Sequence, residues 1–407
     1  MINKIREYFK GISSNVRVLA VGSFFNDVSS EMVYPLLPVF LTMLGATKGF
    51  IGVIEGIAES TASFVKIFSG WYSDKLRARK NIAVTGYAIS GLTRPIVAIA
   101  TRPWHVLTAR FADRIGKGVR TSPRDALLSA SVKPEARAKA FGFHRAMDNS
   151  GALVGPAVAM FILWLKPDDY RFLFWMATIP TAIAVFVIWK WAEDVNTPLP
   201  AGADKPNLSW SALDSRFKAY IVVLFVFTLS NSSDAFLILR AEELGVKDYM
   251  LPLLWIVLHF VKTITNIPGG GLADRWGRRR MIIAGWLLYA LIYAGFAIAQ
   301  VEWHVWVLFA LYGVYFGMTE GAERALVSDL APEAVRGTAY GFFHLAVGLG
   351  ALPASMLFGY LWDRFNGRTA FVFSAALALF ASLLLAVSVR SEAQKLTKVQ
   401  RSDNIHP

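Results

Sequence analysis

The sequence predicts an all-α membrane protein made of two similar six-helix halves, with both ends of the chain in the cytoplasm. Hydrophobic residues make up 55% of the 407 residues, and the mean hydropathy is +0.44. A turn rich in basic residues occurs twice, at Gly70–Lys80 and at Gly270–Arg280, and each copy lies between two long apolar segments. A dense basic cluster cannot lie in hydrocarbon, so both turns are expected at the cytoplasmic surface, as in a duplicated membrane bundle.

Apolar runs of about 20 residues, the length that crosses a bilayer, recur along the whole chain. We expect about twelve spans, near 17–43, 49–72, 81–101, 104–128, 138–165, 171–192, 217–240, 249–272, 281–300, 303–328, 335–361 and 368–389. Too little polar sequence remains for a separate soluble domain. The first span is longer than a signal-peptide core and lacks a small-residue cleavage site, so we expect it to be retained.

The net charge of +13 follows the expected topology. Lys and Arg gather before the first span, in the even-numbered connections and after the last span, whereas the odd connections carry mixed charge. The positive-inside rule then predicts cytoplasmic termini in a cytoplasmic (inner) membrane. A nucleic-acid partner is not expected, because the basic residues are spread over many turns.

One polar segment divides the chain into two halves. Residues 193–215 are polar and proline-rich, and we expect them to link an N-terminal bundle (1–192) to a C-terminal bundle with a short basic tail (216–407). The repeat extends beyond the basic turns, since Pro134-Glu135-Ala136 is matched by Pro332-Glu333-Ala334, and Arg124 falls opposite Arg324.

These motifs resemble those of the major facilitator superfamily of secondary transporters, across nearly the full length of the chain. Gly270 to Arg279 closely matches the loop motif Gly-x-Leu-Ala-Asp-Arg-x-Gly-Arg-Arg, and the first copy departs from it at Arg77 and Ala78. Arg110 to Gly116 resembles the fourth-span arginine motif. Gly151 to Pro156 resembles the first half of the fifth-span motif associated with antiporters. The resemblance implies twelve spans, alternating access and a monomer.

The basic turns and the small residues of the fifth span are expected to control conformation. An Asp near a helix end can accept from the N-terminal amides of a neighbouring helix, and nearby Arg side chains can bind helix-end carbonyls. Such a cluster would latch one conformation; the alternative is that it only anchors the topology. Small residues allow close helix packing. The expected gating set is Gly70, Asp74, Asp148, Gly151, Gly155, Pro156, Gly270, Asp274, Arg275 and Arg278.

Carboxylates inside the spans are candidates for proton coupling, because an ionisable residue in the membrane is costly and faces a cavity or a partner. Asp27 and Glu31 lie one helical turn apart, and Glu59 lies on the second span. Pro35 and Pro38 are expected to bend the first span. The alternative for Glu59 is a structural charge network with Lys66, and Glu55 is expected near the outer surface.

The fourth span carries the most charge and predicts a basic wall of the cavity. Arg120, Arg124 and Arg145 have an alternative role as anchors at the cytoplasmic mouth, and Asp148 is a possible internal partner for the positive charge. Polar residues of the seventh, eighth and tenth spans face the same region. The expected cavity set is Asn26, Tyr34, Arg110, Arg114, Asn231, Asp234, His259, Lys262, Glu320 and Arg324.

Other classes of chemistry are disfavoured. The chain contains no cysteine, which excludes disulfides and thiolate ligands. The histidines are scattered singly, so no metal site is predicted. The sequence has no nucleophile elbow, phosphate-binding loop or His-Glu-x-x-His motif, so we expect neither an enzyme nor a cofactor.

The sequence therefore predicts a secondary transporter of a small solute. We favour proton-driven export of a small organic molecule, on the partial fifth-span motif and the carboxylates within the spans. The alternative is proton-coupled movement of an anionic metabolite or a siderophore-like metal chelate, on the basic stripe of the fourth span.

Overall fold

The computed structural model describes residues 13–76, 79–133, 137–195, 210, 213–331 and 336–388. The ordered elements of these residues are all helices, which confirms the predicted all-α class. Arg77 and Ala78, most of the predicted linker and the predicted basic tail lie outside the described residues. Gly70 and Asp74 fall within a helix, but their side chains are also outside the description.

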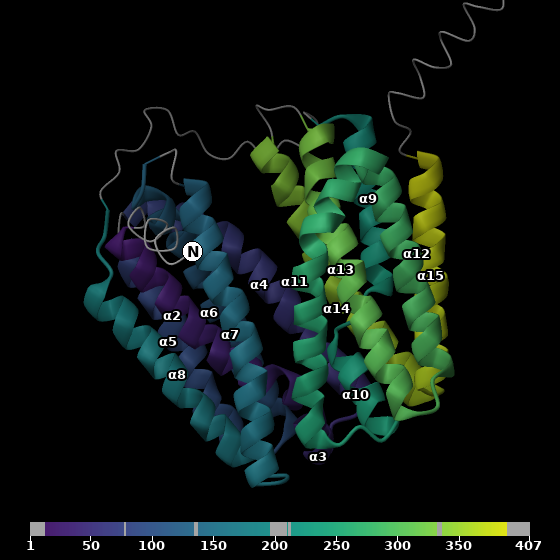
Figure 1. Ribbon diagram of the computed structural model, residues 1–407, viewed down its shortest axis with the longest axis horizontal. Helices are drawn as coiled ribbons and strands as arrows, with labels where there is room; N and C mark the ends of the chain where they lie inside the picture. Colours follow the sequence, from purple (N-terminus) through teal and green to yellow (C-terminus); the bar gives the residue numbers. More distant parts are fainter. Residues whose placement is uncertain are drawn as a thin grey trace, which may run out of the picture.

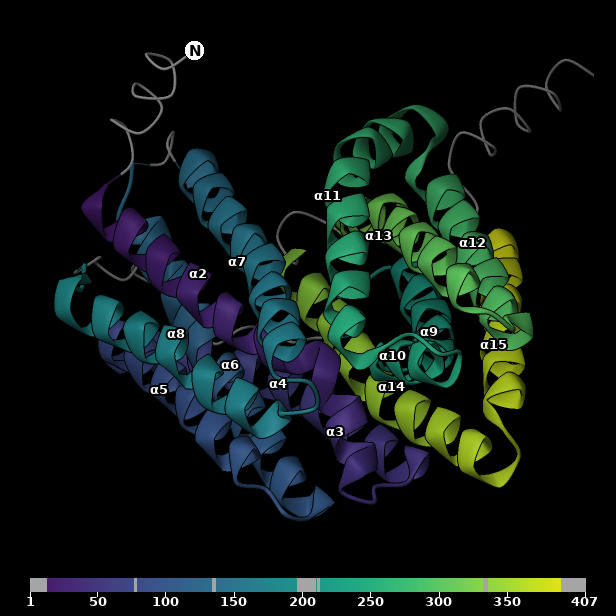
Figure 2. The ribbon, with the colours of Figure 1, turned by 60° about the horizontal axis from the view of Figure 1, so that its bottom comes forward.

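The helices form two groups that lie side by side (Figures 1 and 2). The first group contains α2 (Ser14–Val33), η1 (Tyr34–Leu36), α3 (Leu37–Met43), α4 (Lys48–Leu76), α5 (Arg79–Ala98), α6 (Pro103–Ala130), α7 (Arg137–Leu165) and α8 (Tyr170–Trp191). The second contains α9 (Ser215–Ser230), α10 (Ala235–Glu243), η4 (Asp248–Met250), α11 (Leu251–Trp276), α12 (Arg278–Ile298), α13 (Glu302–Leu330), α14 (Arg336–Arg364) and α15 (Gly367–Ser388). We call these groups the N half and the C half.

Within the described ranges, seven helical segments are long and apolar enough to cross a bilayer by length and composition. Five belong to the C half, where α9 and α10 count together, and the other two are α7 and α8. The two arms of α11, bent by 47°, would make an eighth span. The helices α2, α4, α5 and α6 do not meet this test. For α6 the cause is visible: it buries Arg110, Asp113, Arg114 and Arg120 inside the N half.

Two spans are interrupted. At Pro35 and Pro38, where a bend was predicted, a short 3-10 helix separates α2 from α3. Proline lacks the amide hydrogen that a continuous helix needs. A second break, at residues 231–234 between α9 and α10, was not predicted from the sequence. It places four polar residues, Asn231 to Asp234, in an interruption of a helical segment.

The two halves meet along α4 with α14 and along α7 with α11. The tightest seam is glycine-lined: a Cβ on Gly52 would lie 2.2 Å from the carbonyl oxygen of Ser355, and one on Gly359 would lie 2.4 Å from that of Lys48. The seam begins at the end of the molecule that holds the turns 44–47, 99–102 and 244–247. We call this end the closed face and the opposite end the open face.

A carboxylate fastens the seam at the closed face. The Asp363 side chain, at the end of α14, accepts from the backbone amides of Lys48 at 2.9 Å and of Gly49 at 2.6 Å. These amides start α4, so a carboxylate of the C half caps the positive end of a helix dipole in the N half. The closed face is thus held both by close packing and by a charge–dipole contact.

Because the halves are so close at Gly52, a single added methyl group there should change the conformation. In a free helix, Gly→Ala stabilises by about 1 kcal/mol, but in Gly52→Ala the new Cβ meets the Ser355 carbonyl. We expect this variant to separate the closed face. The native chain has no cysteine, so spin labels at Arg102→Cys and Val301→Cys report the separation as a longer distance.

Gly142→Ala is the matched control, because a Cβ on Gly142 of α7 would meet nothing within 4 Å. It should keep the wild-type distance. A Gly52→Ala protein with the wild-type distance distribution would contradict the role of the seam.

Candidate functional site

A cavity of about 520 Å³ lies between the two halves. Its walls come from α2, α5, α6 and α7 of the N half and from α11 and α13 of the C half. It extends toward the open face, where Asp125, Arg145 and Arg324 line it. A second cavity of about 550 Å³ adjoins it on the C-half side and shares Tyr34, Lys117 and Lys262.

The wall of the first cavity is strongly basic. Its acidic members are Asp27, Asp113, Asp125 and Asp148. Its basic members are Arg94, Arg110, Arg114, Lys117, Arg120, Arg124, Arg145, Lys262 and Arg324. The arginine-rich stripe predicted for the fourth span therefore faces this cavity.

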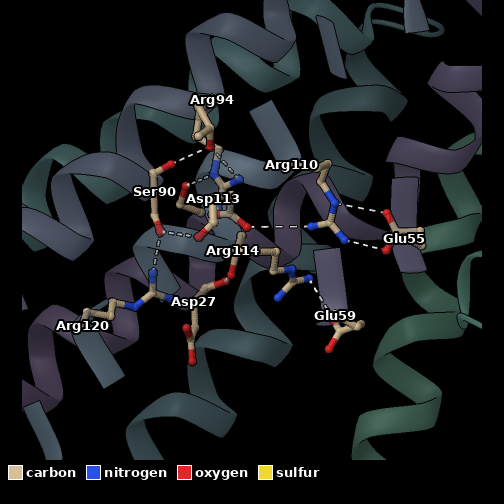
Figure 3. A network of polar contacts seen from close by, with 12 residues as sticks. Asp27, Glu55, Glu59, Ser90, Arg94, Arg110, Asp113, Arg114 and Arg120 are labelled. Carbon is tan, nitrogen blue, oxygen red and sulfur yellow. Dashed lines mark hydrogen bonds and ion pairs between the residues drawn. The ribbon is translucent and has the colours of Figure 1, made fainter. Parts of the chain in front are cut away.

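A chain of buried ion pairs ties together three helices of the N half (Figure 3). Arg94 of α5 pairs with Asp113 of α6 at 3.3 Å, and Asp113 also lies 3.8 Å from Arg110. Arg110 binds Glu55 of α4 in a two-pronged contact, with N–O distances of 2.6 and 3.1 Å. Glu55 is buried, with 2% exposed, and its depth near the outer surface stays a prediction. Burying a charge requires a partner of this quality.

Two further arginines of α6 point into the cavity region with less compensation (Figure 3). Arg114 pairs with Glu59 at 3.3 Å, but its buried Nε has no hydrogen-bond partner. Arg120 donates to the Ser90 hydroxyl at 2.6 Å, and its guanidinium lies 4.9 Å from the centre of the Tyr87 ring. Both arginines are buried, with 7% of each exposed.

The structure seats the candidate carboxylates of α2 against the small residues of α7. A Cβ on Gly151 would lie 3.0 Å from the Cβ of Asp27, and one on Gly155 would lie 3.0 Å from the Cβ of Glu31. Asp27 lines the first cavity and accepts from Asn26, which is itself 1% exposed. The two sets of residues that the sequence singled out separately thus form one interface.

Asp148 lies on the same face of α7, followed by Pro156 within the helix. It pairs with His144 at 3.4 Å, while its Oδ1 is buried without a hydrogen-bond partner. Asp27 and Asp148 interact electrostatically across the α2–α7 interface.

Glu31 connects the two halves. Its carboxylate accepts from the indole N–H of Trp255, on α11, at 2.8 Å. The Tyr34 ring packs on Trp255 at a centroid distance of 5.1 Å and lies 5.2 Å from the Arg110 guanidinium. This cluster lies on the closed-face side of the cavity, near the ends of α2 and the start of α11.

The C half contributes a smaller polar group. At the break between α9 and α10, Asn231 and Asp234 line the second cavity, and the Tyr312 hydroxyl donates to Asp234 at 2.7 Å. Glu320 of α13 is shared by two cations, with Lys262 at 2.9 Å and Arg324 at 3.1 Å.

His259 lies one turn before Lys262 on α11. It lines the first cavity, and its Nε2 is buried without a partner. Within the described ranges, no group of three or more His, Asp or Glu residues is arranged to hold a metal ion.

The second basic turn lies at the open face and is not engaged as a latch. Asp274 is 73% exposed at its side chain and lies 3.8 Å from Arg278 of the next helix. Arg278 also pairs with Asp329 and donates to the Ala325 carbonyl at 3.1 Å, so it joins α12 to α13. Arg275 is exposed, and a Cβ on Gly270 would meet nothing within 4 Å.

Several important residues were missed by sequence reasoning. Arg94 was overlooked because a single arginine in an apolar span gave no periodic pattern. Asp363 was overlooked because its role depends on a backbone 315 residues away. The pairing of Glu55 with Arg110 could have been anticipated, since a buried glutamate requires a cation.

An all-helical fold of two bundles around a charged central cavity defines a membrane transporter. The sequence profile of the Major Facilitator Superfamily matches residues 19–350 and 220–404. The chain belongs to the Major Facilitator Superfamily; it is a multi-pass membrane transporter and not an enzyme.

Three similarities illustrate the relationship. The chain is 34% identical to an uncharacterized MFS-type transporter of Methanocaldococcus jannaschii, over 94% of this chain and 97% of that protein. It is 23% identical to the multidrug resistance protein MdtH of Salmonella arizonae, over 83% of each chain. The crystal structure of a D-xylose-proton symporter superposes with a TM-score of 0.72 at 19% identity, over 93% of this chain and 98% of that one. The last comparison supports the fold alone.

The buried ion-pair chain predicts a stability difference between two glutamates. In Glu55→Gln, the buried Arg110 loses its strongest partner, and breaking such a pair costs about 3–5 kcal/mol. We expect a clearly lower temperature of thermal unfolding in detergent. Glu193→Gln, at an exposed side chain, removes the same charge and should unfold like the wild type. Equal unfolding temperatures for both variants would contradict the structural role of the Glu55–Arg110 pair.

Proposed function

We propose that the protein exports a small organic solute by alternating access, and that proton binding at Glu31 controls the change between its two conformations. The observation that carries this proposal is the hydrogen bond from Trp255 to Glu31, which joins the halves at 2.8 Å on the closed-face side of the cavity. To open the closed face, α2 and α11 must separate there and this bond must break.

The charge state of Glu31 then affects the conformational equilibrium. A carboxylate accepts a hydrogen bond about twice as strong as that accepted by a neutral group. Deprotonated Glu31 therefore stabilises the closed face, and a proton on Glu31 weakens it. A ligand shifts an equilibrium by its different affinity for the two states, so a proton that opposes closure also drives opening.

Asp27 and Glu59 are proposed as further proton-binding groups. Asp27 lines the cavity next to Asp148, whose Oδ1 lacks a donor. Glu59 pairs with Arg114, and 49% of its side chain is exposed. These two carboxylates lie in the cavity region, whereas Glu31 lies deeper, at the contact between the halves.

Export is favoured by the relationship to MdtH, a multidrug resistance protein at 23% identity, and by the partial fifth-span motif at Gly151–Pro156. The proposal includes twelve spans, cytoplasmic termini, residence in the cytoplasmic membrane and a monomeric carrier. In that topology the open face is cytoplasmic, and the solute enters the cavity from inside the cell.

Proteoliposomes with a trapped pH-sensitive dye test the coupling. With an imposed pH gradient, we would add tetraphenylphosphonium, benzoate or ferric citrate in turn and follow both the solute and the dye. A transported solute should move protons with the wild type. In Glu31→Gln the amide cannot bind a proton, so we expect coupled proton movement to fall about tenfold or more.

Glu193→Gln is the control and should behave like the wild type, because its side chain is exposed away from the cavity. Proton movement that persists in Glu31→Gln would remove Glu31 as the coupling group. Solute flux without proton movement in the wild type would remove proton coupling altogether.

A further inference from the structure

We infer that the transported solute is an organic anion, and that its acidic group is bound by Arg114 at the centre of the cavity. The inference rests on the proposed function, because it names the substrate class for the same cavity. Of the solutes that the sequence left open, an organic anion is chosen, and Arg114 is assigned as the residue that binds its acidic group.

The wall of the first cavity carries an excess of positive charge. Nine basic residues and four aspartates line the first cavity. Neighbouring carboxylates compensate part of the excess: Glu55 and Asp113 bind Arg110, and Glu320 serves Lys262 and Arg324. Arg120, however, contacts a hydroxyl and an aromatic ring and forms no ion pair within the described part of the chain. A cavity with low-dielectric walls and an excess of one sign concentrates solutes of the opposite sign.

One atom of the wall, the Nε of Arg114, points to an anion independently of the number of charged residues. Arg114 lines the cavity and is 7% exposed, yet its Nε–H has no acceptor. Its Nη2 is already held by Glu59 at 3.3 Å, which fixes the guanidinium in place. A buried donor without a partner is costly. An oxygen of a carboxylate, sulfonate or phosphate entering the cavity would satisfy it with a charge-assisted bond.

The C half offers a matching group. His259 of α11 lines the same cavity, and its Nε2 is buried and unpartnered. Lys262 follows one turn later with its ammonium 2.9 Å from Glu320. An anion held by Arg114 from one half and by His259 from the other would contact both bundles. Its binding would therefore respond to their relative position, as transport requires.

The remainder of the solute has a different environment. The second cavity adjoins the first at Tyr34, Lys117 and Lys262, and its other lining residues include Tyr312 and Phe316 as well as the carboxylates Glu59, Asp234 and Glu320. Both volumes fall in the range that usually holds small molecules, about 300–1,000 Å³. We therefore assign the acidic head group to the basic cavity, away from these carboxylates, and the remainder of the organic solute to the second cavity, beside Tyr312 and Phe316.

The test is flux into proteoliposomes containing the full-length protein. Fluorescein and rhodamine 123 form a matched pair, since they share a ring scaffold and differ in charge; benzoate and an alkylsulfonate extend the anion set. We expect movement of at least one anion and none of rhodamine 123. Arg114→Gln should lower the anion flux about tenfold or more, the effect of losing one charge-assisted hydrogen bond.

A second variant tests whether Arg114 acts by binding the anion or only by neutralising Glu59. Arg114→Gln removes one positive charge beside Glu59, so the double variant Arg114→Gln/Glu59→Gln restores the balance of charge without restoring the receptor. Its anion exchange, measured at equal pH on both sides so that no proton movement through Glu59 is needed, should stay low, whereas a merely structural role for Arg114 predicts recovery. Lys190→Gln, which removes an exposed charge from α8, should keep the wild-type flux.

Three outcomes overturn the inference: flux of rhodamine 123 without any anion, no movement of any tested anion, or normal anion flux in Arg114→Gln. The proposed coupling fails separately. Anion flux without proton movement would leave the substrate class intact and remove the role of protons. Proton movement driven by rhodamine 123 would support proton coupling and contradict the anionic substrate class.

Discussion

A charge inside a membrane protein must be neutralised by the protein itself, and this constraint shapes the N half. Glu55, Arg94, Arg110 and Asp113 come from three helices and are all buried. They are stable there only because their ion pairs join α4, α5 and α6. The same pairs fix the position of α6, so its remaining arginines face the cavity with defined geometry. Structural charges and functional charges are therefore neighbours on one helix.

The close packing of the halves follows a second rule, that backbone approaches need small residues. At the closed face, Gly52 and Gly359 bring α4 and α14 into contact, and Asp363 adds a charge–dipole bond. At the open face, Asp274 is solvent-exposed and has no such role in this conformation. The two ends therefore differ, as expected for a carrier whose halves rock. Asp363 joins the halves at the closed face, whereas Asp274 makes no such contact at the open face.

The sequence predicted the all-helical fold class and many of the residues that line the cavity, because both depend on local patterns in the sequence. Apolar runs specified helices, and polar residues within them had to face the interior, as Asp27, Arg110 and Arg114 do. What the sequence could not supply was pairing. The partner of Arg110 is 55 residues away, and the partner of Glu31 is 224 residues away. The break at Asn231 was missed for a different reason: serine and asparagine weaken a helix only when tertiary contacts reward the open backbone.

Alternating access requires two halves that close one end of the molecule when the other end opens. The most direct measurement follows both ends at once in lipid nanodiscs, using spin labels at Arg102→Cys and Val301→Cys for the closed face and at Lys133→Cys and Ser388→Cys for the open face. Lowering the pH should lengthen the distance at the closed face and shorten the distance at the open face. The fraction of molecules that changes should be the same for both pairs of labels. Distances that lengthen together, or one that changes while the other stays fixed, would contradict alternating access about this cavity.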